Sequence, residues 1–169
     1  MIQYKDKSVA LRATIPNEAY EWRNHPDIFK WCRQFTLLSR DQHEAWMKSL
    51  PGRPDVKMFG VFTGGAYVGV CGLTGIDRVN QRAEFSLYIG PEFQGKGYGK
   101  DALYTLLRHG FEDMNLFRIW GETFDGNPAF SMFKNLGMVY EGTQRKSYFR
   151  NGKFIDSHLV GMLREEFKP

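Results

Sequence analysis

The clearest pattern of apolar and polar positions lies between residues 82 and 111. Apolar side chains first occupy every second position: Ala83, Phe85, Leu87 and Ile89. A period of two is typical of a β-strand with one buried face. Further along, the apolar side chains recur at helical spacing: Leu103, Leu106, Leu107 and Phe111. We therefore expect a strand over residues 82–89 and an amphipathic helix that begins near residue 100.

The segment between this strand and this helix is rich in glycine. Gly95, Gly97 and Gly99 alternate with larger residues just before the helix begins. Glycine adopts backbone conformations that turn N–H groups toward a ligand, and it has no Cβ in the way. The helix N-terminus adds unpaired donors and a partial charge of roughly half an elementary charge. The segment therefore predicts a binding site for phosphate.

Three kinds of phosphate-binding loop are candidates for this segment. A Walker loop needs Ser or Thr where Tyr98 or Asp101 stands here. A dinucleotide loop needs G-x-G-x-x-G, and the glycine spacing here lacks the extra residue. The pattern Q/R-x-x-G-x-G/A is matched by Gln94, Gly97 and Gly99. On the motif alone, an ordinary glycine-rich turn that starts a helix remains an alternative.

The remaining pattern predicts a chain that alternates strands and helices. We expect strands over residues 8–13, 56–62, 66–73, 116–124, 145–150 and 153–163. We expect helices over residues 16–22, 27–35, 39–50 and 127–136. Gly64-Gly65 and Asn151-Gly152 predict tight hairpin turns, the second of type I′.

Capping residues support the helix boundaries. Ser39 with Gln42 forms a capping box, and the helix that follows should bury Trp46 and Leu50. Asn127 is a favourable N-cap, followed by Pro128 at the first helical position, and Gly137 suits the C-terminal cap. Gly121 within a strand suggests a bulge or a close approach. The order of elements predicts a single domain, residues 1–169, of class α/β (α+β). It is a mixed, mostly antiparallel sheet of about seven strands flanked by helices.

Composition narrows the function classes. With 42% apolar residues the chain should be globular, and it has no run of 18 apolar residues, so we expect no membrane span. Its polar first residues lack the pattern of a secretory signal. Cys32 and Cys71 lack metal-ligand spacing and are expected to be reduced, buried thiols of a cytoplasmic protein. The net charge of +4 suits an anionic ligand, but without an arginine-rich run or nucleic-acid motif we expect no nucleic-acid partner.

Several segments together resemble the GNAT superfamily of acetyltransferases. They are residues 82–85 (Arg-Ala-Glu-Phe), 91–97 (Pro-Glu-Phe-Gln-Gly-Lys-Gly), 134–138 (Lys-Asn-Leu-Gly-Met) and the closing hairpin at 148–153. This set is similar to the branch that acetylates ribosomal-protein N-termini and polyamines. The stretch Trp22-Arg23-Asn24-His25-Pro26-Asp27 resembles a narrower group, the acetyltransferases of nucleotide-linked amino sugars of the pseudaminic acid kind. The resemblance covers essentially the whole chain and is strongest over residues 81–163.

The resemblance implies acetyl-CoA as co-substrate and assigns the residues that would bind it. The CoA diphosphate would lie on the loop made of Gln94, Gly95, Lys96, Gly97, Tyr98, Gly99 and Lys100. Backbone N–H groups of Leu87, Tyr88 and Ile89 would stabilise the oxyanion of the reaction. Asn127 would hydrogen-bond the pantetheine arm in addition to capping its helix. Lys100 and Lys134 could meet CoA phosphates, with a solvated helix face as the equal alternative.

Proton transfer needs a base, because a free amine with a pKa near ~10 is protonated at neutral pH. Glu84 is the candidate base, and a structural role, as a solvent-facing residue or an ion-pair partner of Arg82, stays open. Phe133 stands where many relatives carry a tyrosine that protonates the thiolate. Phenylalanine has no proton to give, and we expect it to pack with Phe130 beside the cofactor.

The thiolate proton would then come from Ser131, our first choice, or from Tyr88, Tyr140 or water. Trp22, Arg23 and Asn24 lie in the segment that borders the acceptor cleft in this fold, although a tryptophan such as Trp22 more often belongs to the core. The four histidines share no ligand spacing, and we expect no metal site.

These observations predict an acetyl-CoA-dependent N-acetyltransferase that acts by direct transfer in a ternary complex. The favoured acceptor is a small-molecule primary amine, the amino group of a nucleotide-linked amino sugar. A protein N-terminus or a polyamine is the alternative acceptor, and a non-catalytic acetyl-CoA-binding module is the alternative class. A homodimer is left open.

Overall fold

The computed structural model describes residues 1–4 and 7–169. Its elements follow the order β1 (Ala10–Arg12), α1 (Glu18–Asn24), α2 (Pro26–Phe29), α3 (Arg40–Ser49), β2 (Val56–Thr63), β3 (Ala66–Asp77), β4 (Arg82–Ile89), α4 (Tyr98–Arg108), β5 (Arg118–Phe124), α5 (Ala129–Asn135), β6 (Val139–Arg150) and β7 (Lys153–Leu163). The strands form one seven-stranded sheet in the order β1-β2-β3-β4-β5-β7-β6. Neighbours are antiparallel except for β4 and β5, which are parallel. The predicted mixed sheet flanked by helices is confirmed.

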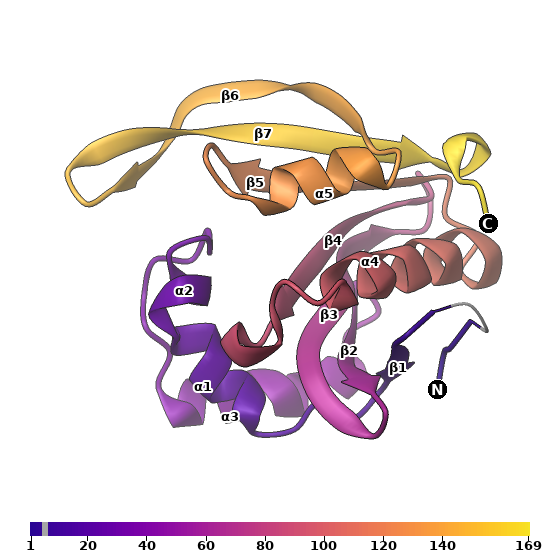
Figure 1. The fold of residues 1–169 in the computed structure, drawn as a ribbon, viewed down its shortest axis with the longest axis horizontal. Coiled ribbons are helices and arrows are strands. Elements are labelled where there is room, and N and C mark those ends of the chain that lie inside the picture. Colours follow the sequence, from indigo (N-terminus) through magenta and orange to yellow (C-terminus); the bar gives the residue numbers. More distant parts are fainter. Residues whose placement is uncertain (5–6) are drawn as a thin grey trace.

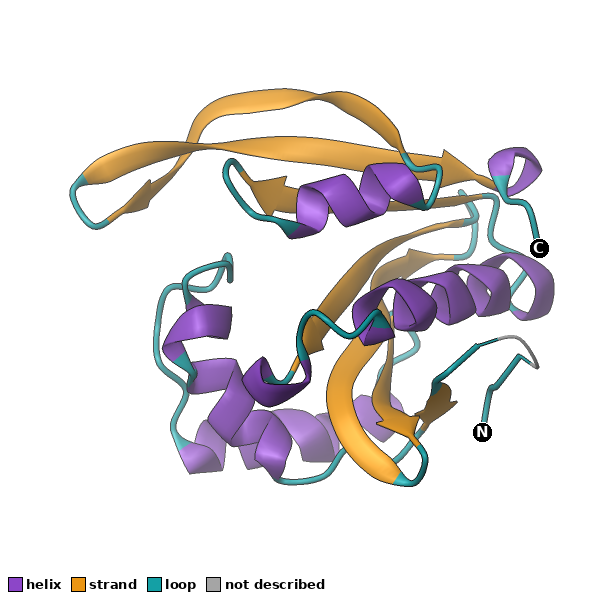
Figure 2. Cartoon of the chain, viewed as in Figure 1, coloured by secondary structure: helices purple, strands orange, loops and turns teal. Residues whose placement is uncertain are grey.

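The elements divide around the middle of the sheet. In Figure 1, β5, β6, β7 and α5 form one half, and β1 to β4 with α4 form the other. The helices α1, α2 and α3 gather at the end opposite the two termini (Figure 2). The β6–β7 hairpin extends above α2, and Arg150 near its tip donates to the carbonyl of Arg33 in the loop that follows α2. Arg33 also forms an ion pair with Glu84 of β4, so this loop contacts both halves.

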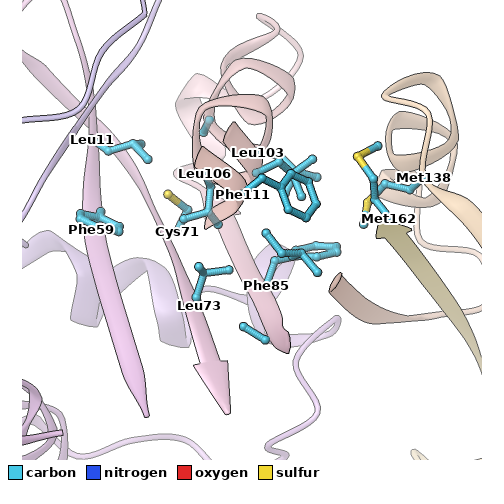
Figure 3. Close-up of a cluster of buried hydrophobic side chains, with 14 of the residues drawn as sticks. Leu11, Phe59, Cys71, Leu73, Phe85, Leu103, Leu106, Phe111, Met138 and Met162 are labelled. Carbon is cyan, nitrogen blue, oxygen red and sulfur yellow. The ribbon is translucent and has the colours of Figure 1, made fainter. Parts of the chain in front are cut away.

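The core lies between α4 and the strands that it crosses. Figure 3 shows Leu103 and Leu106 of α4 among side chains of the strands, including Leu11 and Cys71. All four of these side chains have no exposed surface. The helical spacing read from the sequence thus marks the buried face of α4. Cys71 is a buried thiol as expected, whereas Cys32 is only half-buried.

The capping and turn predictions are confirmed at atomic detail. The Ser39 hydroxyl accepts from the Gln42 amide at 3.1 Å, and the Gln42 side chain accepts from the Ser39 amide at 2.9 Å. Asn151 and Gly152 have φ of 49° and 78°, as a type I′ turn requires. The prediction that α3 buries Trp46 and Leu50 is wrong. Its buried residue is His43, which packs edge-on against Tyr20 with ring centroids 5.7 Å apart.

Several predicted boundaries also differ from the structure. The first helix continues to Asn24, and the second ends at Phe29 rather than near residue 35. The strand β6 begins at Val139, well before the predicted residue 145. Its pairing with β7 is interrupted by two register shifts, so the alternation of buried and exposed positions is lost there.

The parallel strands β4 and β5 form a fork. They pair over only three residues each, Arg82–Glu84 with Arg118–Trp120. The next residues in this register are Phe85 and Gly121, and a Cβ on Gly121 would lie 2.3 Å from the Phe85 ring. The ring of Phe133 packs edge-on against Phe85, with centroids 5.0 Å apart. The close approach expected at Gly121 is thus confirmed, and it lies where the two strands part.

We predict that Gly121→Ala destabilises the fold because its methyl group would enter the Phe85 ring. The expected loss is about 1–3 kcal/mol, measured as the free energy of unfolding in urea. Gly52→Ala is the matched control, since a Cβ there meets no atom within 4 Å. An unchanged urea midpoint for Gly121→Ala would contradict the packing described at the fork.

Candidate active site

The separation of β4 and β5 opens a cleft of about 840 Å³. One wall is β4 from Glu84 to Ile89, and the other is Glu122 and Thr123 of β5 with the start of α5. The glycine loop borders the cleft at one end, and Arg23 and the loop after α2 border it at the other. Most residues predicted to bind the cofactor therefore line one continuous space.

The glycine loop has the backbone geometry that the sequence pattern suggested. Gly95 and Gly97 have φ of 75° and 84°, and residues other than glycine adopt such values only with strain. A Cβ at either position would meet no atom within 4 Å, so the loop faces open space. Asp101 donates the first backbone hydrogen bond of α4 to the Gly97 carbonyl, at 3.1 Å. The amides of Tyr98, Gly99 and Lys100 precede this bond and are free to bind an anion.

The polar side chains of this loop take different roles. Gln94 lines the cleft and donates to the carbonyl of Ile89 at 3.0 Å, which ties the loop to the end of β4. Lys96 does not line the cleft but donates to the Glu92 carbonyl at 3.0 Å. Lys100 lines the cleft, whereas Lys134 extends over the Phe130 ring on the exposed surface of α5. Lys100 is therefore better placed than Lys96 or Lys134 to meet a bound phosphate.

The edge of β4 beyond the fork faces the cleft. Leu87, Tyr88 and Ile89 pair with β3 on their other side and have no partner in β5. Peptide groups on such an edge can bind an extended ligand. The Tyr88 hydroxyl donates to the Ala19 carbonyl at 3.3 Å, and burial raises the pKa of Tyr88.

The start of α5 supplies Asn127 and Phe133. The Asn127 side chain accepts from the Ala129 amide at 3.0 Å, so it caps the helix as predicted, and it also lines the cleft. Phe133 is buried, and its ring packs against Phe85. The sequence had predicted Phe130 as its packing partner. Ser131 is exposed on α5 and does not line the cleft. Its position therefore does not favour Ser131 as the proton donor.

A cluster of charged groups lies at the end of the cleft opposite the glycine loop. Arg33 forms an ion pair with Glu84 of β4, and its Nη1 lies 3.1 Å from Oε2 of Glu122 in β5. The Tyr148 hydroxyl donates to the same Glu122 oxygen at 3.1 Å. Glu84 is therefore paired with Arg33 and not with Arg82, whose partner is Asp77 at 3.6 Å.

Burial controls the electrostatics of this cluster. The side chains of Glu84 and Glu122 are 15% and 5% exposed. Burial raises the pKa of Glu84, opposed by the Arg33 guanidinium and assisted by the nearby Glu122. A raised pKa brings a carboxylate closer to the working range of a general base.

The three residues predicted to contact the acceptor make different contacts in the structure. Trp22 is buried and stacks on Tyr67, with ring centroids 4.8 Å apart, so its role is structural. The Asn24 side chain holds the backbone of Leu38 through two hydrogen bonds of 2.9 and 3.0 Å. Arg23 alone of the three lines the cleft, and among the described residues its Nη1 has no hydrogen-bond partner. Both side chains are thus used within the fold, Trp22 in the core role that the sequence favoured for it, and their contact with the acceptor stays a prediction.

Sequence reasoning missed Arg33, Glu122 and Tyr148. Glu122 carried a signal, since it interrupts the otherwise mostly apolar run from Ile119 to Phe124 near the end of a strand. Arg33 carried none, because a loop arginine is ordinarily solvated. Tyr148 was part of the hairpin motif and had no assigned role.

In residues 1–4 and 7–169, no three His, Cys, Asp or Glu side chains are grouped so that they could hold a metal ion. Across the same residues, every helix is too short or too polar to cross a membrane.

Comparison with protein families agrees with this geometry. The model described as an acetyltransferase (GNAT) domain matches residues 10–139. The chain belongs to the GNAT acetyltransferase family. The family and the fold that the sequence predicted are thereby confirmed.

Curated GNAT relatives include members of each branch that the sequence resembled. The spermidine N(1)-acetyltransferase of Escherichia coli K12 is 32% identical over 112 residues, which are 66% of this chain and 60% of the relative. The acetyltransferase PseH of Campylobacter jejuni is 29% identical over 111 residues, 64% of this chain and 66% of that protein. The matches span 57% to 60% of the first curated relatives' lengths.

Solved structures give the same fold. The spermidine N-acetyltransferase of Vibrio cholerae, in complex with CoA and spermine, superposes with a TM-score of 0.87 at 24% identity. The superposition covers 94% of this chain and 97% of that one. Over nearly its full length, this chain therefore has the fold of that structure.

We predict that Gly97→Ala weakens acetyl-CoA binding by about tenfold or more, equivalent to about 1.4 kcal/mol. The methyl group strains the left-handed backbone of residue 97 and projects where the CoA diphosphate must approach the loop amides. Calorimetric titration with CoA measures the effect. Gly65→Ala is the matched control, because Gly65 has a similar φ of 89° and equally open surroundings in the β2–β3 hairpin. Equal CoA affinity of both variants would contradict the role of the loop.

Proposed function

We propose that this GNAT domain transfers an acetyl group from acetyl-CoA to a primary amine. The observation that carries the proposal is the fork between β4 and β5. The cleft that opens at the fork is bordered by the glycine loop, which would bind an anion, and by the buried carboxylates of Glu84 and Glu122. Acetyl transfer to an amine needs both, one to hold the donor and one to accept a proton.

The residues of the cleft suit acetyl-CoA. The amides of Gly95 to Lys100 and the N-terminus of α4 would hold its diphosphate, and the free edge of β4 with Asn127 would hold the pantetheine arm. The carboxylate of Asp101, in the first turn of α4, is held by Ser8, whose backbone amide donates to it at 3.0 Å. When bound, acetyl-CoA supplies the activated acetyl group.

Glu84 is the base of the proposed reaction. It lies on the cleft wall, and its carboxylate would take the proton that an ammonium must lose before it becomes a nucleophile, directly or through a water. The neighbouring backbone of Leu87 to Ile89 offers donors for the charge that develops on the acetyl oxygen. Since Ser131 and Tyr140 do not line the cleft and Tyr88 is bound to Ala19, we propose that water protonates the thiolate.

For the acceptor we favour an alkyl amine that is positively charged in solution, as polyamines are. Glu84 and Glu122 place two carboxylates at the acceptor end, and relatives named spermidine N(1)-acetyltransferase match at 30% and 32% identity. A nucleotide-linked amino sugar is the second candidate. Arg23 favours it, since its Nη1, which has no hydrogen-bond partner in residues 1–4 and 7–169, could bind a phosphate at the cleft, and PseH is among the relatives.

An acceptor panel tests the proposal. We expect CoA release with spermidine and other alkyl amines, and much slower release with UDP-linked amino sugars and with peptides that have a free N-terminus. Faster turnover of the nucleotide-linked sugars would reverse the order of the two acceptor classes. Saturable CoA binding without turnover of any amine would favour a non-catalytic binding module.

Glu84→Gln should lower kcat by about 10² to 10⁴ with little change in acetyl-CoA affinity. In the wild type, kcat should fall as the pH is lowered, because the base is lost when Glu84 is protonated. Burial raises the pKa of Glu84, so this fall should begin at a higher pH than for an ordinary glutamate. Glu44→Gln on the exposed surface of α3 serves as the control. A kcat that is unchanged in Glu84→Gln would remove Glu84 from the mechanism.

A further inference from the structure

The space between Glu84 and Glu122 is filled by a cation of the protein itself. Arg33 contacts both carboxylates, one from each of the strands that part at the fork. Its own side chain is 43% exposed, so the guanidinium reaches the cluster from the solvent side. The two carboxylates belong to the sheet, whereas Arg33 belongs to a loop.

Glu122 is not fully satisfied by this arrangement. Its Oε2 accepts from Arg33 and from Tyr148, but among the described residues its Oε1 has no hydrogen-bond partner. The side chain is only 5% exposed and lines the cleft. An unpaired carboxylate oxygen in such a place is costly, so this oxygen would accept from a water or from a donor group of a bound ligand.

The loop that carries Arg33 is fastened from outside the cluster. Arg150 near the tip of the β6–β7 hairpin donates to the Arg33 carbonyl, and its guanidinium lies 4.5 Å from the centre of the Phe35 ring. Among the described residues, Nε of Arg150 has no hydrogen-bond partner. These contacts hold the loop without the Arg33 guanidinium, so a change of the Arg33 rotamer would leave them intact.

We propose that Glu84 and Glu122 form the subsite for the ammonium group of the acceptor, and that Arg33 is a built-in occupant which the acceptor displaces. This deepens the proposed function and rests on it. The incoming ammonium would donate to both carboxylates, including the unpaired Oε1 of Glu122. It would then give one proton to Glu84, leaving a neutral amine and a neutral carboxylic acid, while Glu122 keeps its charge and holds the amine. Arg33 is here a residue that determines specificity, favouring acceptors that arrive as cations.

Removing the occupant should strengthen acceptor binding. If Arg33 blocks the subsite most of the time, the apparent affinity is reduced by the free fraction, so Arg33→Ala should bind the acceptor about five- to tenfold more tightly. The measurement is calorimetric titration of the CoA complex with 1,4-diaminobutane. Arg53→Ala is the matched control, since Arg53 also pairs with a carboxylate, at 2.7 Å, and is 42% exposed, but lies outside the cleft. Adding Glu122→Gln to Arg33→Ala should abolish the gain.

Free guanidinium provides a readout that a merely structural role would not produce. At millimolar concentration it should compete with 1,4-diaminobutane in Arg33→Ala and have little effect on the wild type, with sodium chloride at equal ionic strength as the control. In the acetyl-transfer assay, the same variant should show a lower KM for the amine and an unchanged KM for acetyl-CoA.

Equal or weaker diamine binding in a folded Arg33→Ala variant, without competition by guanidinium, would overturn the proposal. Arg33→Gln decides the question if the alanine variant does not fold. The calorimetric result does not depend on turnover. If no amine is acetylated, the proposed function fails while the subsite is still tested by binding.

Discussion

The contact of the Phe85 ring with Gly121 lies where β4 and β5 separate, and the cleft depends on this separation. It lies directly after the three residue pairs that join β4 to β5, and no larger residue than glycine would fit beneath the ring. Phe133 supports the ring from α5. A continuous parallel pairing would have consumed the backbone donors of β4 within the sheet. Because the strands part here, those donors and the side chains of Glu84 and Glu122 face a common space.

The two ends of this space have opposite electrostatic character. At one end the amides of the glycine loop and the N-terminus of α4 present partial positive charge. At the other, two buried carboxylates present negative charge that a single arginine partly neutralises. An anionic donor and a cationic acceptor would thus bind at opposite ends of the cleft, with the β4 edge between them. The arrangement favours bringing an acetyl group and an amine together at Glu84.

The local elements were largely predictable from the sequence because short-range rules govern them. The alternation from Ala83 to Ile89, the capping box at Ser39 and the turn at Asn151-Gly152 each depend on neighbours in the chain. The close approach at Gly121 was predictable as a feature, although its partner Phe85 was not. Irregular pairing concealed the start of β6, since register shifts disturb the period that marks a strand.

The acceptor side of the site depends on contacts between distant segments and could not be predicted in the same way. The sequence assigned Trp22 and Asn24 to the acceptor. In the structure Trp22 stacks on Tyr67, and the Asn24 side chain hydrogen-bonds the backbone of Leu38. It gave no reason to bring Arg33 to Glu84 and Glu122, which lie far along the chain. The most direct measurement of the central claim is a crystal structure of the complex with CoA. We expect diphosphate oxygens within hydrogen-bond distance of amides from Gly95 to Lys100, and the thiol beside β4 beyond the fork. A diphosphate bound by side chains elsewhere, with the loop carbonyls facing the cleft, would contradict it.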